Sequence, residues 1–114
     1  MSGKRDDKDY LADIQEAIER IQEYTKGYSF ERFVDDRKTQ DAVIRNLEVI
    51  GEAAKAISNA LKERYPEIPW RSMAGLRDRL IHHYFGINYE IVWQVVTEEL
   101  PKLKGHIRRA MGDE

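Results

Sequence analysis

A long run of apolar residues at helical spacing is the feature that most constrains this chain. Six of them follow one another at alternating intervals of four and three: Val43, Leu47, Ile50, Ala54, Ile57 and Leu61. This alternation puts them on one stripe of a helix that packs at a shallow angle on its neighbours. Small residues in GEAAKA, positions 51–56, would let another backbone approach closely. We therefore expect one long helix over 36–65, capped by Asp35 or Asp36.

Helical spacing continues through the rest of the chain. We expect further helices over about 8–25, 70–85 and 89–111, and a short turn over 30–36 that Ser29 can cap. Pro66 and Pro69 close the long helix, because proline lacks a backbone donor and has a fixed φ. Asn88 can cap the last helix, and Pro101 should kink it near Glu98. The sequence contains no alternating run long enough for a sheet.

These patterns predict an all-α protein, an up-and-down bundle of four to five helices that forms a single domain over 1–114. Residues 1–7 precede the first helix and are expected to form a flexible tail. Trp70, Trp93 and several tyrosines leave apolar surface that one copy of such a bundle would not cover. We therefore expect a homodimer.

Charge and composition exclude several classes of function. A net charge of −2 argues against a general DNA-coating protein, although a local positive cleft could still hold one RNA strand. The chain has no cysteine, which excludes disulfides, thiolate nucleophiles and cysteine-based zinc sites. No stretch approaches the roughly 20 apolar residues of a membrane span, and the N-terminus lacks the apolar run of a secretory signal. We expect a cytoplasmic protein without membrane association.

The stretch RDRLIHHYF, residues 77–85, places two of the three histidines of the chain beside an arginine and a tyrosine. Arginine offers a planar fork of donors that matches two phosphate oxygens. Histidine can accept and return a proton near neutral pH. When RNA is cut without a metal, the ribose 2′-hydroxyl attacks phosphorus, which requires a proton-transfer group and a cation that stabilises the phosphoryl oxygens. Arg77 and His82 are the candidates for these roles.

Spacing alone does not bring the two candidates together. On an ideal helix, residues five positions apart point about 140° away from each other. Three explanations stay open: the helix is distorted over 80–85, the arginine stem bends round, or a dimer seam completes the cleft from both copies. We favour the seam. Tyr84 does fall on the face of Arg77. The competing interpretation is that the histidines are structural or solvent-facing and that 77–79 is a solvated charge run.

At these residues the sequence resembles the HepT-like toxins, a branch of the HEPN ribonuclease superfamily. Their signature is similar to Arg77, four intervening residues, His82, one more residue and Tyr84. Asp78 occupies a position that is polar in that family and often asparagine. The stretches DDRKTQDAVIRNLEVIGEAAK, IPWRSMAGLRDRLIHHY and ELPKLK resemble HepT-like chains in the same order. The resemblance extends from Tyr10 to Arg108.

The resemblance implies a dimeric helical bundle that cleaves RNA without metal or other cofactor, in a cleft at the dimer interface. Arg77 would hold the scissile phosphate and His82 would move the proton. Asp78 would orient Arg77 or the helix end, although its carboxylate could also repel a phosphate or pair with Arg79.

The resemblance also implies a partner. This would be a minimal nucleotidyltransferase antitoxin, MntA-like, which binds the toxin of a type VII toxin–antitoxin pair and silences it by adenylylating Tyr84. Toxin and antitoxin could form an assembly larger than the dimer. An alternative function stays open: a non-catalytic dimeric partner subunit of a nucleotidyltransferase, which binds nucleotide or protein without cutting RNA.

Glu48 and Glu52 share a helical stripe with Arg45. We favour an exposed, salt-bridged face for this stripe. The alternative is that Arg45 or Glu48 lines the cleft and positions Arg77.

Three other groups complete the candidates. A basic patch suits either a helix C-terminus or contact with an RNA backbone, and comprises Lys102, Lys104, Arg108 and Arg109. His106 lacks a histidine partner at metal-binding spacing, so we expect no metal site. Three aromatic residues could stack on bases, but we expect them to cover a small core: Tyr28, Phe30 and Phe33.

Overall fold

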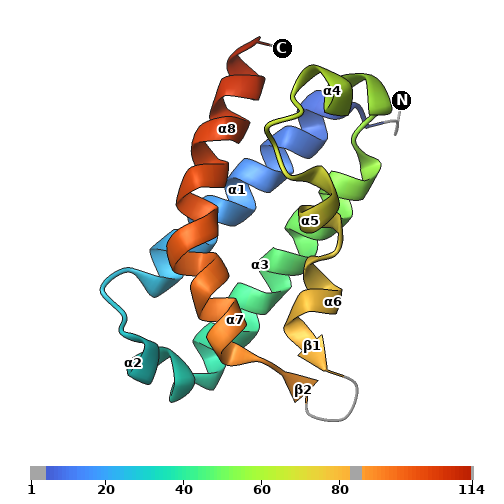
Figure 1. Cartoon of the computed structure of the whole chain (residues 1–114). Helices are drawn as coiled ribbons and strands as arrows, with labels where there is room; N and C mark the ends of the chain where they lie inside the picture. Colours follow the sequence, from blue (N-terminus) through green and yellow to red (C-terminus); the bar gives the residue numbers. More distant parts are fainter. Residues whose placement is uncertain (1–4, 83–85, 114) are drawn as a thin grey trace.

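The computed structural model describes residues 5–82 and 86–113, and helices dominate it (Figure 1). The helices are α1 Asp7–Thr25, α2 Phe30–Val34, α3 Arg37–Ala56, α4 Asn59–Arg64, α5 Trp70–Ala74, α6 Leu76–Leu80, α7 Tyr89–Gln94, the π-helical η1 Val95–Glu99 and α8 Leu100–Asp113. Two strands, β1 Ile81–His82 and β2 Gly86–Ile87, form a small antiparallel hairpin. The predicted all-α fold is confirmed. None of the described helices is long and apolar enough to cross a membrane.

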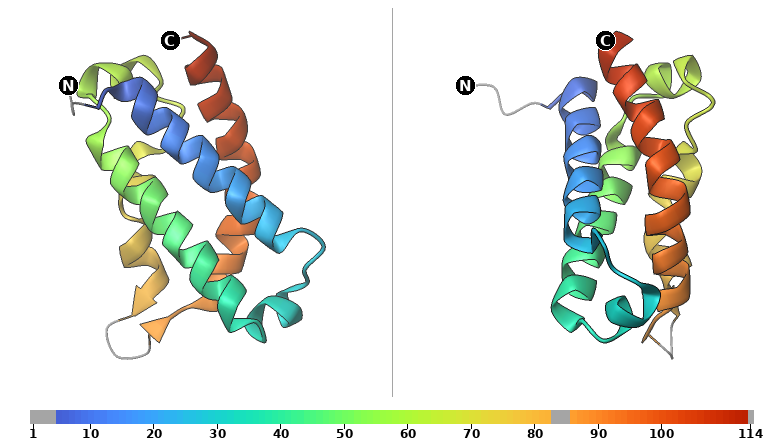
Figure 2. Two further views of the ribbon diagram at one scale, coloured as in Figure 1. Left: turned by 180° about the vertical axis from the view of Figure 1, so that it is seen from behind. Right: turned by 90° about the vertical axis from the view of Figure 1, so that its left-hand side faces the viewer.

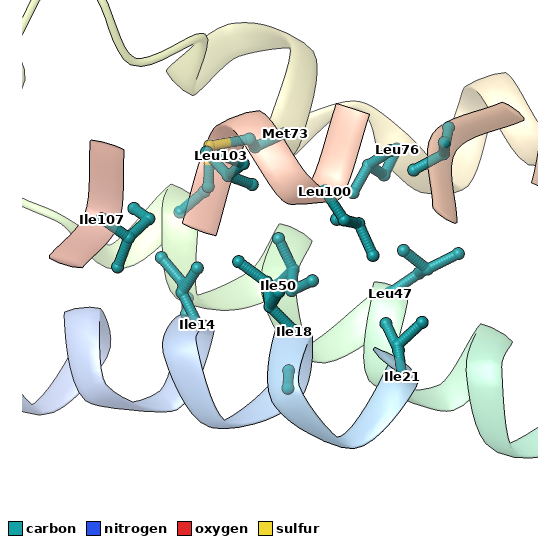
Figure 3. Close-up of a cluster of buried hydrophobic side chains, with 14 of the residues drawn as sticks. Ile14, Ile18, Ile21, Leu47, Ile50, Met73, Leu76, Leu100, Leu103 and Ile107 are labelled. Atoms are coloured by element: carbon teal, nitrogen blue, oxygen red, sulfur yellow. The ribbon is translucent and has the colours of Figure 1, made fainter. Parts of the chain in front are cut away.

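Helices α1 and α3 lie side by side, α8 packs against α1, and α5 and α6 pack against α3 (Figures 1 and 2). Between them lies one core. Figure 3 shows the isoleucines of α1 pointing toward Leu47 and Ile50 of α3 and toward the apolar side chains of α8. Each residue of the stripe predicted over 43–61 is at most 3% exposed. The stripe therefore performs the packing role that its spacing indicates.

The long helix expected over 36–65 is two helices, and the expectation was wrong at that point. α3 ends at Ala56, and Ser58 caps α4 by accepting a hydrogen bond from the Leu61 N–H at 3.2 Å. The Ser58 N–H and hydroxyl in turn donate to the two carboxylate oxygens of Asp7, at 2.9 and 2.6 Å. Asp7 of α1 accepts the hydrogen bonds of the Ser58 N–H and hydroxyl at this corner. The backbone can therefore end one helix and start another without leaving these polar groups unpaired.

The start of α1 is held by its own polar residues. Asp6 and Asp9 form a capping box in which each carboxylate accepts the backbone N–H of the other residue, both at 3.1 Å. Arg5 pairs with Asp13, nearly two turns into the helix. Of the tail expected over 1–7, positions 1–4 lie outside the described residues. Within the rest of that range, Asp6 is the N-cap of α1 and Asp7 is its first residue.

Near Glu98, where a kink was expected, the structure has the π-helical turn η1. Val92, Val96 and Leu100 are buried and spaced by four and four, one residue more than the roughly seven that two α-helical turns contain. A π turn absorbs the extra residue and keeps the three side chains on the core side. Pro101 fits here because it has no N–H to donate to the carbonyl of the preceding turn.

Candidate functional site

The segment with the candidate site departs from the helix expected over 70–85. Gly75 separates α5 from α6, and α6 ends at Leu80. Ile81 is extended, with φ −112° and ψ 125°, and begins the strand β1. The Asn88 N–H donates to the Leu80 carbonyl at 2.8 Å, and Gly86 takes a φ of 75°. The expected helix is therefore wrong after Leu80, because the chain closes a hairpin there in place of another turn.

This departure changes the relation between the two candidate catalytic residues. Arg77 lies in α6, whereas the backbone of His82 lies in β1, paired with Gly86. The angle of about 140° between them applied to a continuous helix, which the structure does not have. Distortion over 80–85, one of the three explanations, is thus observed up to His82. The dimer seam stays a prediction, and Tyr84 lies outside the described residues.

Arg77 is exposed and lines a shallow hollow between α3 and the α5–α6 segment, which we call the Arg77 hollow. Its lining is Leu47, Glu48, Gly51, Glu52, Lys55, Ala74 and Arg77. Its volume of about 20 Å³ leaves room for roughly one water molecule. A phosphate would therefore meet the Arg77 guanidinium at the mouth of the hollow and not inside it.

The stripe of Arg45, Glu48 and Glu52 divides in the structure. Glu48 is half-buried and lines the Arg77 hollow. Arg45 is exposed and lies outside that lining. Whether either residue lines the catalytic cleft and positions Arg77 stays a prediction. Glu52 pairs with Lys55 at 3.7 Å, which agrees with an exposed salt-bridged face. Two carboxylates consequently lie beside Arg77.

Two backbones approach each other closely beside the hollow, at Gly51. A methyl group built on Gly51 would lie 3.2 Å from the backbone carbonyl oxygen of Met73 in α5. The small residues of α3 thus serve the role predicted for them at this position.

Asp78 and Arg79 point to different partners. Asp78 is exposed in the first turn of α6. Arg79 donates to both carboxylate oxygens of Glu99, at 3.1 and 2.8 Å, and to the Ser72 hydroxyl at 3.0 Å. Hydrogen bonding to Glu99 raises the pKa of Arg79. Arg79 therefore does not serve as the partner of Asp78, and sequence spacing gave no signal of the contact with Glu99, 20 positions away.

The comparisons with known proteins bear on this site. The family model described as "Ribonuclease HepT-like" matches residues 14–110. The chain belongs to the HepT-like ribonuclease family.

Relatives of this HepT-like chain match it over most of their length. "Probable ribonuclease HepT" of Thermococcus cleftensis is 56% identical over 106 residues, which is 93% of this chain and 96% of the relative. A candidate RNase of Methanocaldococcus jannaschii is 51% identical over 98 residues, or 86% of this chain and 81% of the relative. Another candidate RNase of that organism is 44% identical over 104 residues, which is 91% of this chain and 95% of the relative. No solved structure gave a significant match.

Two of the three aromatic candidates of the HepT-like chain have clear structural roles. Phe33 is fully buried and stacks on Trp93 with ring centroids 5.1 Å apart, which confirms the expectation of core. Tyr28 is half-buried, and its hydroxyl donates to Asp36 at 2.7 Å. This bond, with two more from Thr39, lowers the pKa of Asp36 from 3.8 to about 2. Asp36 also caps α3, so this cluster fixes a helix start.

The remaining candidates lie on α8. Lys104 donates to the side-chain oxygen of Gln22 at 3.1 Å, which ties this part of the basic patch to α1. The other three basic residues of the patch are exposed. His106 is half-buried. Across 5–82 and 86–113, no group of histidine, aspartate and glutamate side chains is arranged to hold a metal ion.

Proposed function

We propose that this HepT-like protein is a metal-independent endoribonuclease, the toxin of a type VII toxin–antitoxin pair. The observation that carries the proposal is the placement of Arg77 and the His82 backbone on either side of the end of α6. Arg77 offers an exposed cation at the mouth of a hollow. His82 follows on a strand, so its position is no longer tied to the far side of the same helix. Membership of the HepT-like family supports the same reaction.

In the proposed reaction, Arg77 binds the non-bridging oxygens of the scissile phosphate and stabilises their charge in the transition state. The ribose 2′-oxygen forms a bond to phosphorus while the bond from phosphorus to the 5′-oxygen breaks. His82 either takes the proton of the 2′-hydroxyl or protonates the departing 5′-oxygen, and water makes the other proton transfer. The products are a 2′,3′-cyclic phosphate on one fragment and a 5′-hydroxyl on the other.

Regulation is part of the proposal. A homodimer seam completes the cleft, and a minimal nucleotidyltransferase antitoxin transfers AMP to the Tyr84 hydroxyl. The bulky, negatively charged nucleotide then blocks the groove and repels RNA. Mass spectrometry of the protein coexpressed with such a nucleotidyltransferase should show one added AMP, and Tyr84→Phe should abolish it. AMP transfer to the Tyr84→Phe variant at an unchanged level would contradict this assignment.

Incubation of the purified protein with RNA in EDTA tests the nuclease. We expect cleavage, and we expect Arg77→Ala and His82→Ala to abolish it. Arg71→Ala and His106→Ala are matched controls, because they remove the same side-chain types at positions without a proposed role. Cleavage that survives Arg77→Ala or His82→Ala would overturn the mechanism.

One observation favours a second candidate function. Glu48 and Glu52 beside Arg77, with Asp78 next to it in the chain, weaken the attraction of this cation for a phosphate. Under the alternative, the protein is a non-catalytic dimeric subunit that binds a nucleotidyltransferase. That function predicts no cleavage in the assay above and loss of nucleotidyltransferase binding on changes at Arg77 or Tyr84.

A further inference from the structure

Arg79 joins three separate parts of the chain beside the proposed site. Its guanidinium donates to both oxygens of Glu99 at the end of η1 and to the Ser72 hydroxyl in α5, while Arg79 itself belongs to α6. A bidentate arginine–carboxylate pair holds its two groups in one plane, so it fixes orientation as well as distance. We call these three side chains the Arg79 clamp.

Apart from this clamp, α6 is held by its packing against α3 and α7 and, at its C-terminal end, by the Asn88 N–H bond to the Leu80 carbonyl. It spans five residues, too few for a helix to persist without tertiary contacts. Its buried side chains are Leu76 and Leu80, 4% and 2% exposed. Two anchors four positions apart lie along one line on the helix surface. Hydrophobic contacts along one line resist translation of the helix but do little against rolling about that line.

Arg77 and Arg79 lie on opposite sides of this short helix, because two positions correspond to about 200°. Arg77 faces the hollow against α3, and Arg79 reaches across to η1. We propose that Arg79 is a positioning residue, whose contacts with Glu99 and Ser72 stop α6 from rolling and so fix where Arg77 meets the phosphate. The inference rests on the proposed ribonuclease function, which it deepens.

The structure argues against a direct role of Arg79 with RNA. Both of its terminal nitrogens are already engaged, by Glu99 and Ser72. A phosphate would have to displace a carboxylate that matches the guanidinium fork. The competing interpretation is an ordinary surface ion pair, since both side chains are more than one-third exposed, at 37% and 43%. Such a pair would add little stability and would leave the reaction unchanged.

A double-mutant cycle separates these interpretations. We expect Arg79→Ala and Glu99→Ala each to lower kcat per folded molecule by about 10- to 100-fold, since small displacements of a catalytic group have effects of this size. The KM for RNA should change little, because Arg77 still carries its charge. The double variant should be no slower than either single variant, because both remove the same contact.

The matched control is Glu16→Ala and Arg20→Ala, an exposed ion pair within α1 at 2.6 Å. It should leave kcat and KM unchanged. Unchanged kcat in Arg79→Ala, or losses in the two single variants that simply multiply in the double variant, would overturn the inference.

Hydrogen exchange tests the clamp without using activity. The Ile81 amide donates to the Arg77 carbonyl and so reports on the integrity of α6. In both clamp variants this amide should exchange faster, while amides in the middle of α3 keep their wild-type rates. If wild-type protein cuts no RNA, the proposed function fails, and the exchange result still decides whether Arg79 fixes α6. Wild-type exchange at Ile81 in both variants would overturn the clamp in either case.

Discussion

Helix α3 runs for 20 residues with buried side chains along its whole length, whereas α6 runs for five with two buried leucines. α3 shares its core with α1 and α8, which are themselves 19 and 14 residues long. The α6 segment ends in a two-residue strand. The candidate catalytic residues Arg77 and His82 belong to the second region alone.

The difference indicates that the long helices and the short elements have different roles, in stability and in placing the site. Long helices bury enough apolar surface to supply most of the folding free energy. Short elements are held by a few specific contacts, and their geometry can therefore place a charged side chain where no regular helix would put it. The predictions below test whether stability and activity separate along this division.

The largest effect should come from Arg77 in the short segment. Arg77→Ala should bring RNA cleavage below detection, a loss in kcat of at least about 10²- to 10³-fold, because a donor to the charged phosphoryl oxygens is lost. Its side chain is exposed, so the unfolding free energy should stay within about 0.5 kcal/mol of wild type. Kinetics together with urea unfolding check both expectations. A large loss of stability would show that the two regions are not independent.

The next effect concerns the long helices. Ile18→Ala should lower the unfolding free energy by about 2–5 kcal/mol, because Ile18 of α1 is fully buried in the core and its loss leaves a cavity. Val34→Ala is the control, since Val34 is 42% exposed and should cost less than about 1 kcal/mol. Denaturant unfolding measures both. At a temperature where Ile18→Ala is folded, its kcat should equal that of wild type; a lower kcat per folded molecule would contradict the division.

Two glycine-to-alanine variants compare an open position in α8 with the close contact between α3 and α5. Gly105→Ala in α8 should stabilise the protein by up to about 1 kcal/mol, because nothing lies within 4 Å of the added methyl and alanine favours helix. Gly51→Ala adds the same methyl 3.2 Å from the Met73 carbonyl. It should lose that gain and destabilise by about 1 kcal/mol, because α3 and α5 would have to separate. Equal unfolding midpoints for the two variants would show that this approach is not tight.

The smallest effect concerns pH and the start of α3. Asp36 has a folded pKa of about 2, below its ordinary 3.8, because Tyr28 and Thr39 hydrogen-bond its ionised form. Its contribution to stability is therefore present above a pH of about 4 and is lost as pH falls toward about 2. The unfolding midpoint of wild type should drop more over this interval than that of Asp36→Asn, which keeps a capping side chain. Asp35→Asn, at an exposed position, should follow wild type; identical profiles for all three would contradict the assignment.

Sequence periodicity predicted the helices well where burial is regular. The stripe through Val43 and Leu61 and the caps at Ser29 and Asn88 depend on residues close in the chain, and the structure contains all of them. The break between α3 and α4 could not be predicted, because the cap at Ser58 is completed by Asp7, 51 positions away.

The candidate site was predictable in its residue types but not in its geometry. Arg77 and His82 were recognisable from their chemistry and from the HepT-like signature. The end of α6 at Leu80 depends on a hairpin whose partner strand follows later in the chain. That Glu48, and not Arg45, lines the Arg77 hollow depends on how α3 packs against α5 and α6.

By itself the sequence determined the all-α fold class, the apolar faces of the long helices and the family, because each depends on side-chain order along the chain. The tertiary structure alone decided where α3 and α6 end, which carboxylates lie beside Arg77 and which partner Arg79 takes. Those features depend on hydrogen bonds and approaches between distant segments, whose free energies arise only after the helices have packed.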